Sequence, residues 1–97
     1  MKNLAYLSKI FKALSNPHRL ELYLRIRAHH GLDLKRERKK PCFVSAICEN
    51  WNIGAPTISH HLKELINAGL IETDKEGKFT TCTLNSKVLS EVRDLFM

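Results

Sequence analysis

The fold is decided by the stretch Ala55-Pro-Thr-Ile-Ser-His-His-Leu-Lys-Glu-Leu-Ile-Asn-Ala-Gly-Leu70. Apolar residues recur in it at three- and four-residue intervals, a spacing that places them on one face of a helix. We predict a helix that begins after Gly54, continues to Ala68 and stops at Gly69, because glycine commonly follows a helix C-terminus. The predicted buried stripe consists of Ile58, Leu62, Leu65 and Ile66.

The opposite face of this helix carries small and hydrogen-bonding groups. At about 100° per residue, His60 points almost directly away from the stripe. Around it lie Pro56, Thr57, Lys63 and Glu64, with Ser59 at one edge. Such groups suit the approach to base edges in a DNA major groove, and nearby cations neutralise phosphates. A solvated surface helix has the same polarity, so this face alone does not decide between the two interpretations.

The segments on either side of this helix complete a motif. Before it, Val44, Ile47, Cys48 and Trp51 predict a short helix from Phe43, and Asn52 is expected in the tight turn that follows. After it, residues 70–73 and 78–84 predict two strands joined by the polar turn 74–77. Two short helices separated by a tight turn and followed by a charged hairpin have the order of a winged helix-turn-helix.

The two ends of the chain are predicted to be helical as well. Apolar spacing from Leu4 to Leu14 predicts one helix, and Asn16-Pro17 predicts the start of a second that runs to about His29 and ends at Gly31. A last helix over 86–97, capped by Asn85 or Ser86, carries Val88, Leu89, Val92, Leu95 and Phe96. The predicted fold class is therefore mainly α, with about five helices and a two-stranded wing.

Length and composition limit the interpretation further. A chain of 97 residues with 43% hydrophobic residues suits one domain, which we take as residues 1–97. Sixteen basic and ten acidic side chains give a net charge of +6, which favours a polyanionic partner, either nucleic acid or an anionic membrane surface. The N-terminus has no signal-peptide pattern and no apolar stretch is long enough to cross a bilayer, so we expect a cytoplasmic protein without a membrane partner.

Two motifs carry a specific resemblance. The stretch Phe11-Lys-Ala-Leu-Ser-Asn-Pro-His-Arg-Leu20, together with residues 55–70, resembles the ArsR/SmtB family of bacterial and archaeal repressors. The resemblance implies a homodimer whose interface is formed by the terminal helices, at about 3–15 and 86–97. It also implies that the winged helix of each protomer reads one half of a pseudo-palindromic operator in double-stranded DNA.

The resemblance also suggests DNA-binding residues. Ala55, Pro56, Thr57, Ser59 and His60 match the part of the recognition helix that commonly touches DNA in this family. The family often has glutamine and serine in place of Ala55 and Pro56, so two hydrogen-bonding side chains are missing here. Lys63 on the helix and Lys75 and Lys78 in the wing are expected to hold the DNA backbone, although a solvated turn would also explain the two wing lysines.

Many members of this family respond to a metal ion or a thiol reaction. The residues of this chain match neither of two metal sites that are common in the family. One family metal site needs two cysteines two residues apart, but here Val44 follows Cys42 at that distance. Another needs a histidine in the last helix, and residues 86–97 contain none. We therefore expect no metal site and no cofactor. The pair His29-His30 is expected to be exposed at a helix end rather than to hold a metal with Cys42.

The cysteines and the basic run leave alternatives open. Cys48 and Cys82 fall on apolar faces and are expected to be structural, whereas Cys42, beside the cationic run from Lys35 to Lys40, is the candidate redox-sensing thiol. The run itself is either a contact to DNA phosphates or a solvated loop.

The predicted function is a sequence-specific DNA-binding transcriptional regulator, a repressor that binds its operator as a homodimer. The alternatives are a thiol- or metal-responsive variant of the same fold, and a winged-helix module that binds proteins. No glycine loop, paired acids or nucleophile elbow indicates an enzyme.

Overall fold

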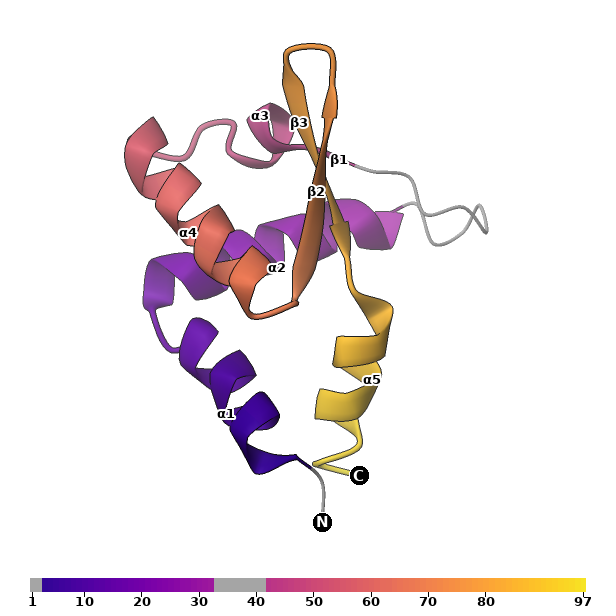
Figure 1. Ribbon diagram of the computed structural model, residues 1–97. Coiled ribbons are helices and arrows are strands. Elements are labelled where there is room, and N and C mark those ends of the chain that lie inside the picture. The colour runs from indigo at the N-terminus through magenta and orange to yellow at the C-terminus, as the bar shows by residue number, and fades with distance from the viewer. Residues whose placement is uncertain (1–2, 33–41) are drawn as a thin grey trace.

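The computed structural model describes residues 3–32 and 42–97, except for the side chains of residues 30–32 and of Cys42 (Figure 1). Its elements follow the predicted order, and the winged helix-turn-helix fold is confirmed. They are α1 (Leu4–Ala13), α2 (Pro17–Leu32), β1 (Cys42–Phe43), α3 (Val44–Ile47), α4 (Ala55–Asn67), β2 (Ile71–Glu76), β3 (Phe79–Leu84) and α5 (Ser86–Arg93). In Figure 1, the β2–β3 hairpin projects from one end of the molecule, while α1 and α5 lie at the other end.

The wing is longer than predicted and its sheet has a third strand. β2 and β3 pair antiparallel from Ile71 opposite Leu84 to Glu76 opposite Phe79, so the turn contains Gly77 and Lys78 rather than residues 74–77. Gly77 has φ +65°, a conformation that glycine adopts without strain. On the other side of β3, β1 pairs Cys42 with Cys82 and Phe43 with Thr81. The short helix predicted from Phe43 begins one residue later, at Val44, with Phe43 as its N-cap. The strand β1 was not predicted, because a two-residue strand is too short to show alternation.

Three helix boundaries also differ from the prediction. α2 continues through Gly31 to Leu32, and α5 ends at Arg93 rather than at the C-terminus. α3 has a single turn, and the chain then passes through Asn50, whose φ of +60° identifies it as the tight-turn residue in place of Asn52. Asparagine tolerates this region of backbone space, so the residue type was right and the position was two residues too late.

The turn between α1 and α2 is held by side chains of the first motif. The Asn16 Oδ1 atom accepts hydrogen bonds from the backbone N–H groups of His18 at 3.0 Å and Arg19 at 3.1 Å, which confirms its predicted capping role. The Arg19 guanidinium donates to the carbonyl oxygens of Ala13 and, at 3.3 Å, Lys12. A cation is therefore placed at the C-terminus of α1, where the helix dipole favours it.

The recognition helix α4 buries a different stripe from the one predicted. His61, Leu65 and Ala68 are its buried residues, and they pack with α2. Ile66 is 39% exposed, and Ile58 and Leu62 are only half-buried. The actual buried line is rotated by about one residue, because Ile58 and Leu62 lie beneath the wing rather than against α2.

One arginine ties the first helix of the motif to the core. The Arg25 guanidinium donates to the Ile47 carbonyl at the end of α3 (3.2 Å), pairs with Glu21 (2.9 Å) and lies 4.5 Å from the centre of the Trp51 ring. These contacts fix α3 and the turn after it against α2, and so determine where α4 begins.

Candidate nucleic-acid interface

The eight predicted DNA-binding residues are all exposed. Six lie on α4, one lies in β2 and one lies in the hairpin turn; they are Ala55, Pro56, Thr57, Ser59, His60, Lys63, Lys75 and Lys78. Ala55 and Ser59 from α4 border the same hollow as Lys78 from the turn. The fold therefore places the start of the recognition helix next to the wing, although the rest of α4 and all of β2 separate the two parts of this surface in sequence.

The start of α4 is organised by its backbone. Gly54 occupies the N-cap position and its carbonyl accepts hydrogen bonds from the N–H groups of Thr57 and Ile58, both at 3.1 Å. Pro56 lies in the first turn, where its missing N–H costs no hydrogen bond and its fixed φ suits a helix. At the other end, Gly69 has φ +79° and ends the helix as predicted.

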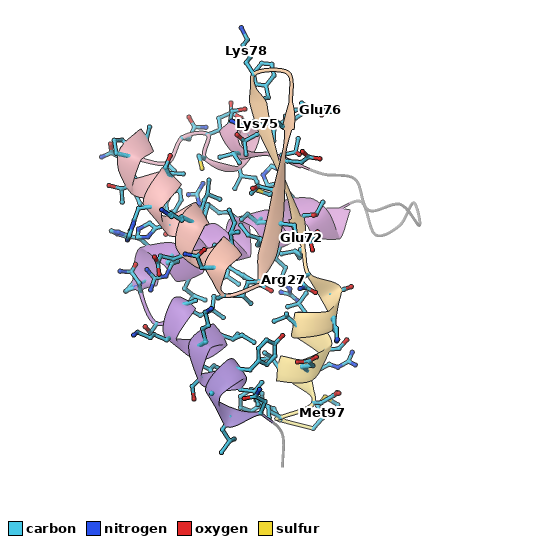
Figure 2. The ribbon with its side chains drawn as sticks, in the orientation of Figure 1. Arg27, Glu72, Lys75, Glu76, Lys78 and Met97 are labelled. Atoms are coloured by element: carbon cyan, nitrogen blue, oxygen red, sulfur yellow. The ribbon has the colours of Figure 1, made fainter. Side chains whose placement is uncertain are left out.

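The two faces of the wing have opposite charge. Side chains alternate along a strand, so Glu72, Asp74 and Glu76 share one face of β2 while Lys75 lies on the other. The face of Lys75 is continuous with the buried Ile71 and is therefore turned toward the helices. The predicted turn residue Lys75 thus belongs to a strand, while Lys78 extends from the tip of the hairpin (Figure 2).

Lys75 is held by the strand opposite. Its ammonium donates a 2.9 Å hydrogen bond to the Thr80 hydroxyl, and Lys75 and Thr80 are direct partners in the β2–β3 register. The Lys78 ammonium lies 5.8 Å from the centre of the Phe79 ring. Lys75 therefore has a hydrogen-bond partner in the opposite strand and Lys78 lies near an aromatic ring, while both lysines are exposed.

The residue that sequence reasoning missed is His61. Its side chain is buried, and neither ring nitrogen has a hydrogen-bond partner among the described residues. Its ring centre lies 6.4 Å from that of His18 and 6.0 Å from that of His60. Burial lowers the pKa of His61 below its ordinary value of 6.5, and the charges of Arg19, His60 and His18 lower that pKa further. A helical wheel rotated by one position would have identified it as an inward-facing residue.

The cysteines give no assembled site. Cys82 is fully buried in the core, as predicted, whereas Cys48 is only half-buried at the end of α3. Burial raises the pKa of the Cys48 thiol, and the nearby charge of Arg25 opposes that rise. The side chain of Cys42, the run from Lys35 to Lys40 and the side chain of His30 lie outside the described residues. The redox role of Cys42 therefore stays a prediction.

No group of three or more His, Cys, Asp or Glu side chains in residues 3–29 and 43–97 is arranged to hold a metal ion. In the part of the chain that the structure describes, no helix combines the length and apolar character that a membrane span requires.

Comparison with known proteins identifies the family. Residues 36–73 match the family described as "Bacterial regulatory protein, arsR family". The transcriptional repressor SdpR of Bacillus subtilis (strain 168) is 33% identical over 85 residues, which cover 88% of this chain and 82% of SdpR. The chain belongs to the arsR family. Another relative is the arsenical resistance operon repressor of Staphylococcus xylosus, which is 34% identical over 89 residues, covering 89% of this chain and 72% of that protein.

Solved structures of arsR-type proteins have the same fold. One of an ArsR family transcriptional regulator superposes with a TM-score of 0.75 at 23% identity, covering 98% of this chain and 87% of that one. An ArsR-like transcriptional regulator from Rhodococcus sp. RHA1 gives a TM-score of 0.66 at 21% identity, covering 94% and 76%. The arsR fold therefore accounts for the whole arrangement of α4 and the wing.

The burial of His61 predicts acid sensitivity. Because the folded protein favours the neutral imidazole, the unfolded chain binds a proton at a higher pH than the folded one. The free energy of unfolding should therefore fall as the pH drops below about 6.5. The free energy of unfolding, measured with urea between about pH 7 and pH 5, should fall less steeply with decreasing pH in His61→Leu than in the wild type. His29→Gln, which removes a histidine of α2 that is not among the groups acting on His61, is the control and should keep the wild-type slope. An unchanged slope in His61→Leu would show that another group causes the acid sensitivity.

Proposed function

We propose that this chain is a transcriptional repressor that binds an operator in double-stranded DNA as a homodimer. The observation that carries the proposal is the position of the exposed polar face of α4 beside the wing, where Ala55 and Ser59 border the same hollow as Lys78. Relatives named as repressors, SdpR and the arsenical resistance operon repressor, support the direction of regulation. In this proposal the protein is a regulator rather than an enzyme, and it needs no cofactor to bind DNA. It acts in the cytoplasm, where the chromosome is accessible to it.

The exposed residues of α4 divide the work of recognition. Thr57, Ser59 and His60 carry hydrogen-bonding groups and are proposed to approach base edges in the major groove. Ala55 and Pro56 offer no side-chain hydrogen bond, so they contribute close contact at the start of the helix. Lys63, Lys75 and Lys78 are proposed to neutralise phosphates, which increases affinity without reading the sequence.

The terminal helices supply the proposed dimer interface. Within the described residues, large apolar side chains remain exposed on α1 and after α5: Leu4 at 59%, Phe11 at 41%, Phe96 at 77% and Met97 at 92%. Phe11 and Phe96 meet edge to face, with their ring centres 6.3 Å apart, so α1 and the C-terminal segment meet in an apolar terminal patch. It lies at the end of the molecule opposite the tip of the wing, and Met97 marks it in Figure 2. A two-fold axis through this patch would cover it and leave both recognition helices facing outward.

Variants of the two kinds of DNA contact should behave differently. His60→Ala should reduce the preference for operator over scrambled DNA by about tenfold, because a base contact is lost. Lys63→Ala should weaken binding to both DNAs alike and lower the slope of log K against log salt by about one. Fluorescence anisotropy measures both quantities. Lys87→Ala, which removes an exposed lysine from α5, is the matched control. If His60→Ala kept the wild-type sequence preference, the assignment of His60 to base contact would be wrong.

The interface is tested by placing a charge in the terminal patch. Phe96→Asp should convert the dimer to a monomer, because the buried carboxylate would be desolvated without a partner. Phe79→Asp introduces the same charge at another exposed phenylalanine, in the wing, and should leave the dimer intact. Sedimentation equilibrium gives the mass of each variant. A wild-type monomer at micromolar concentration, or a Phe96→Asp dimer, would contradict the proposed interface.

A further inference from the structure

A groove lies between the helix-turn-helix and the wing. It has a volume of about 350 Å³ and is lined by α3, by the first half of α4 and by the residues of β3 next to the hairpin turn. Ser45 from α3 and Thr80 from β3 line it together with Lys78. Phe79 and Ile58 supply apolar surface. The predicted contact residues included neither Ser45 nor Thr80.

The position of this protein groove matches the place where a strand of bound DNA would pass. A helix that reads base edges enters the major groove, and the adjoining minor groove lies on the far side of one sugar-phosphate strand. An element that projects beside the helix must therefore cross that strand. The groove between α4 and the wing is the place on this surface where the strand would pass.

The side chains that line the groove suit a sugar-phosphate strand of DNA. None of the described residues that line it is acidic, and it offers an ammonium group, apolar surface and three hydroxyl groups, those of Ser45, Ser59 and Thr80. A phosphodiester needs donors and positive charge, while the deoxyribose on either side of it is largely apolar. Another hollow on the wing is lined by Glu72, Asp74 and Glu76 together with Lys75, and its three carboxylates would repel a phosphate.

The Thr80 hydroxyl is prepared to act as a donor. Its oxygen accepts a hydrogen bond from the Lys75 ammonium at 2.9 Å, and a hydroxyl has one hydrogen of its own left to donate. The neighbouring positive charge polarises this O–H group and strengthens any bond that it makes to an anion. In a complex with DNA, Lys75 thus acts on the sugar-phosphate strand through Thr80 as well as by its own charge.

We propose that this groove binds the sugar-phosphate strand between the two DNA grooves, with one phosphate held by Thr80, Ser45 and Lys78. The proposal rests on the proposed function, because it places a strand of the operator. It assigns two further DNA-binding residues, Thr80 and Ser45, and it makes Lys75 a positioning residue. The acidic face of β2 is turned away from DNA in this arrangement.

The test couples single phosphates to single side chains. Operator duplexes are prepared in which one phosphate at a time is replaced by an uncharged methylphosphonate, and each is titrated by anisotropy with wild-type protein and with Thr80→Val. We expect a position in each half-site where the replacement weakens wild-type binding by about tenfold, the loss of one hydrogen bond to a charged group. At that position Thr80→Val should show little further loss, because its partner is already gone. Ser45→Ala should show the same coupling.

The control is Thr83→Val, which changes another half-buried threonine of β3 that does not line the groove. At every methylphosphonate position, this variant should lose as much binding affinity as the wild type does. If Thr80→Val also lost as much as the wild type at every position, the groove would not hold a phosphate and the assignment would be wrong. Equal wild-type affinity for operator and scrambled DNA would instead overturn the proposed function, and the groove assignment with it.

Discussion

The packing of α4 against α2 is the contact on which the rest of the structure depends. A helix of thirteen residues is marginal on its own in water, so its stability comes from burying one side. His61, Leu65 and Ala68 form that side. Because this line faces the core, the opposite face with Ser59 and Lys63 must face solvent. The same packing that holds the helix therefore also determines which residues are available to DNA.

Two polar ties carry this arrangement to the neighbouring elements. Arg25 joins α2 to the end of α3 and to Trp51, which sets the turn before α4. After α4, the Asn85 side chain caps α5 through its Oδ1 atom, and its Nδ2 donates to the Gly69 carbonyl at 2.9 Å. The wing leaves the core between these two ties, and its strand β2 carries Glu72, Asp74 and Glu76 on one face. A small domain thus holds a reading helix and a charged wing in a fixed relation, while its terminal helices keep an apolar patch for a partner.

The order of elements was predictable because each helix carries its own periodicity and each boundary its own signal, such as Asn16 before α2 and Gly69 after α4. The exposed face of α4 was predictable for the same reason. Three features were not. β1 has only two residues and exists because β3 is beside it. The burial of His61 depends on the rotation of α4 about its axis. The spacing of apolar residues does not determine that rotation to within one residue. The groove lined by Ser45 and Thr80 joins segments far apart in sequence, and no local pattern indicates it.

The central claim is that this surface recognises a DNA sequence and not merely negative charge. It is tested most directly by fluorescence anisotropy, in which the wild-type protein is titrated onto DNA from upstream of its own gene and onto scrambled DNA of equal length, at several salt concentrations. The account predicts tighter binding to the native fragment, with a preference that persists at physiological salt. Equal affinities that disappear together as salt rises would contradict it, because they would show electrostatic attraction alone.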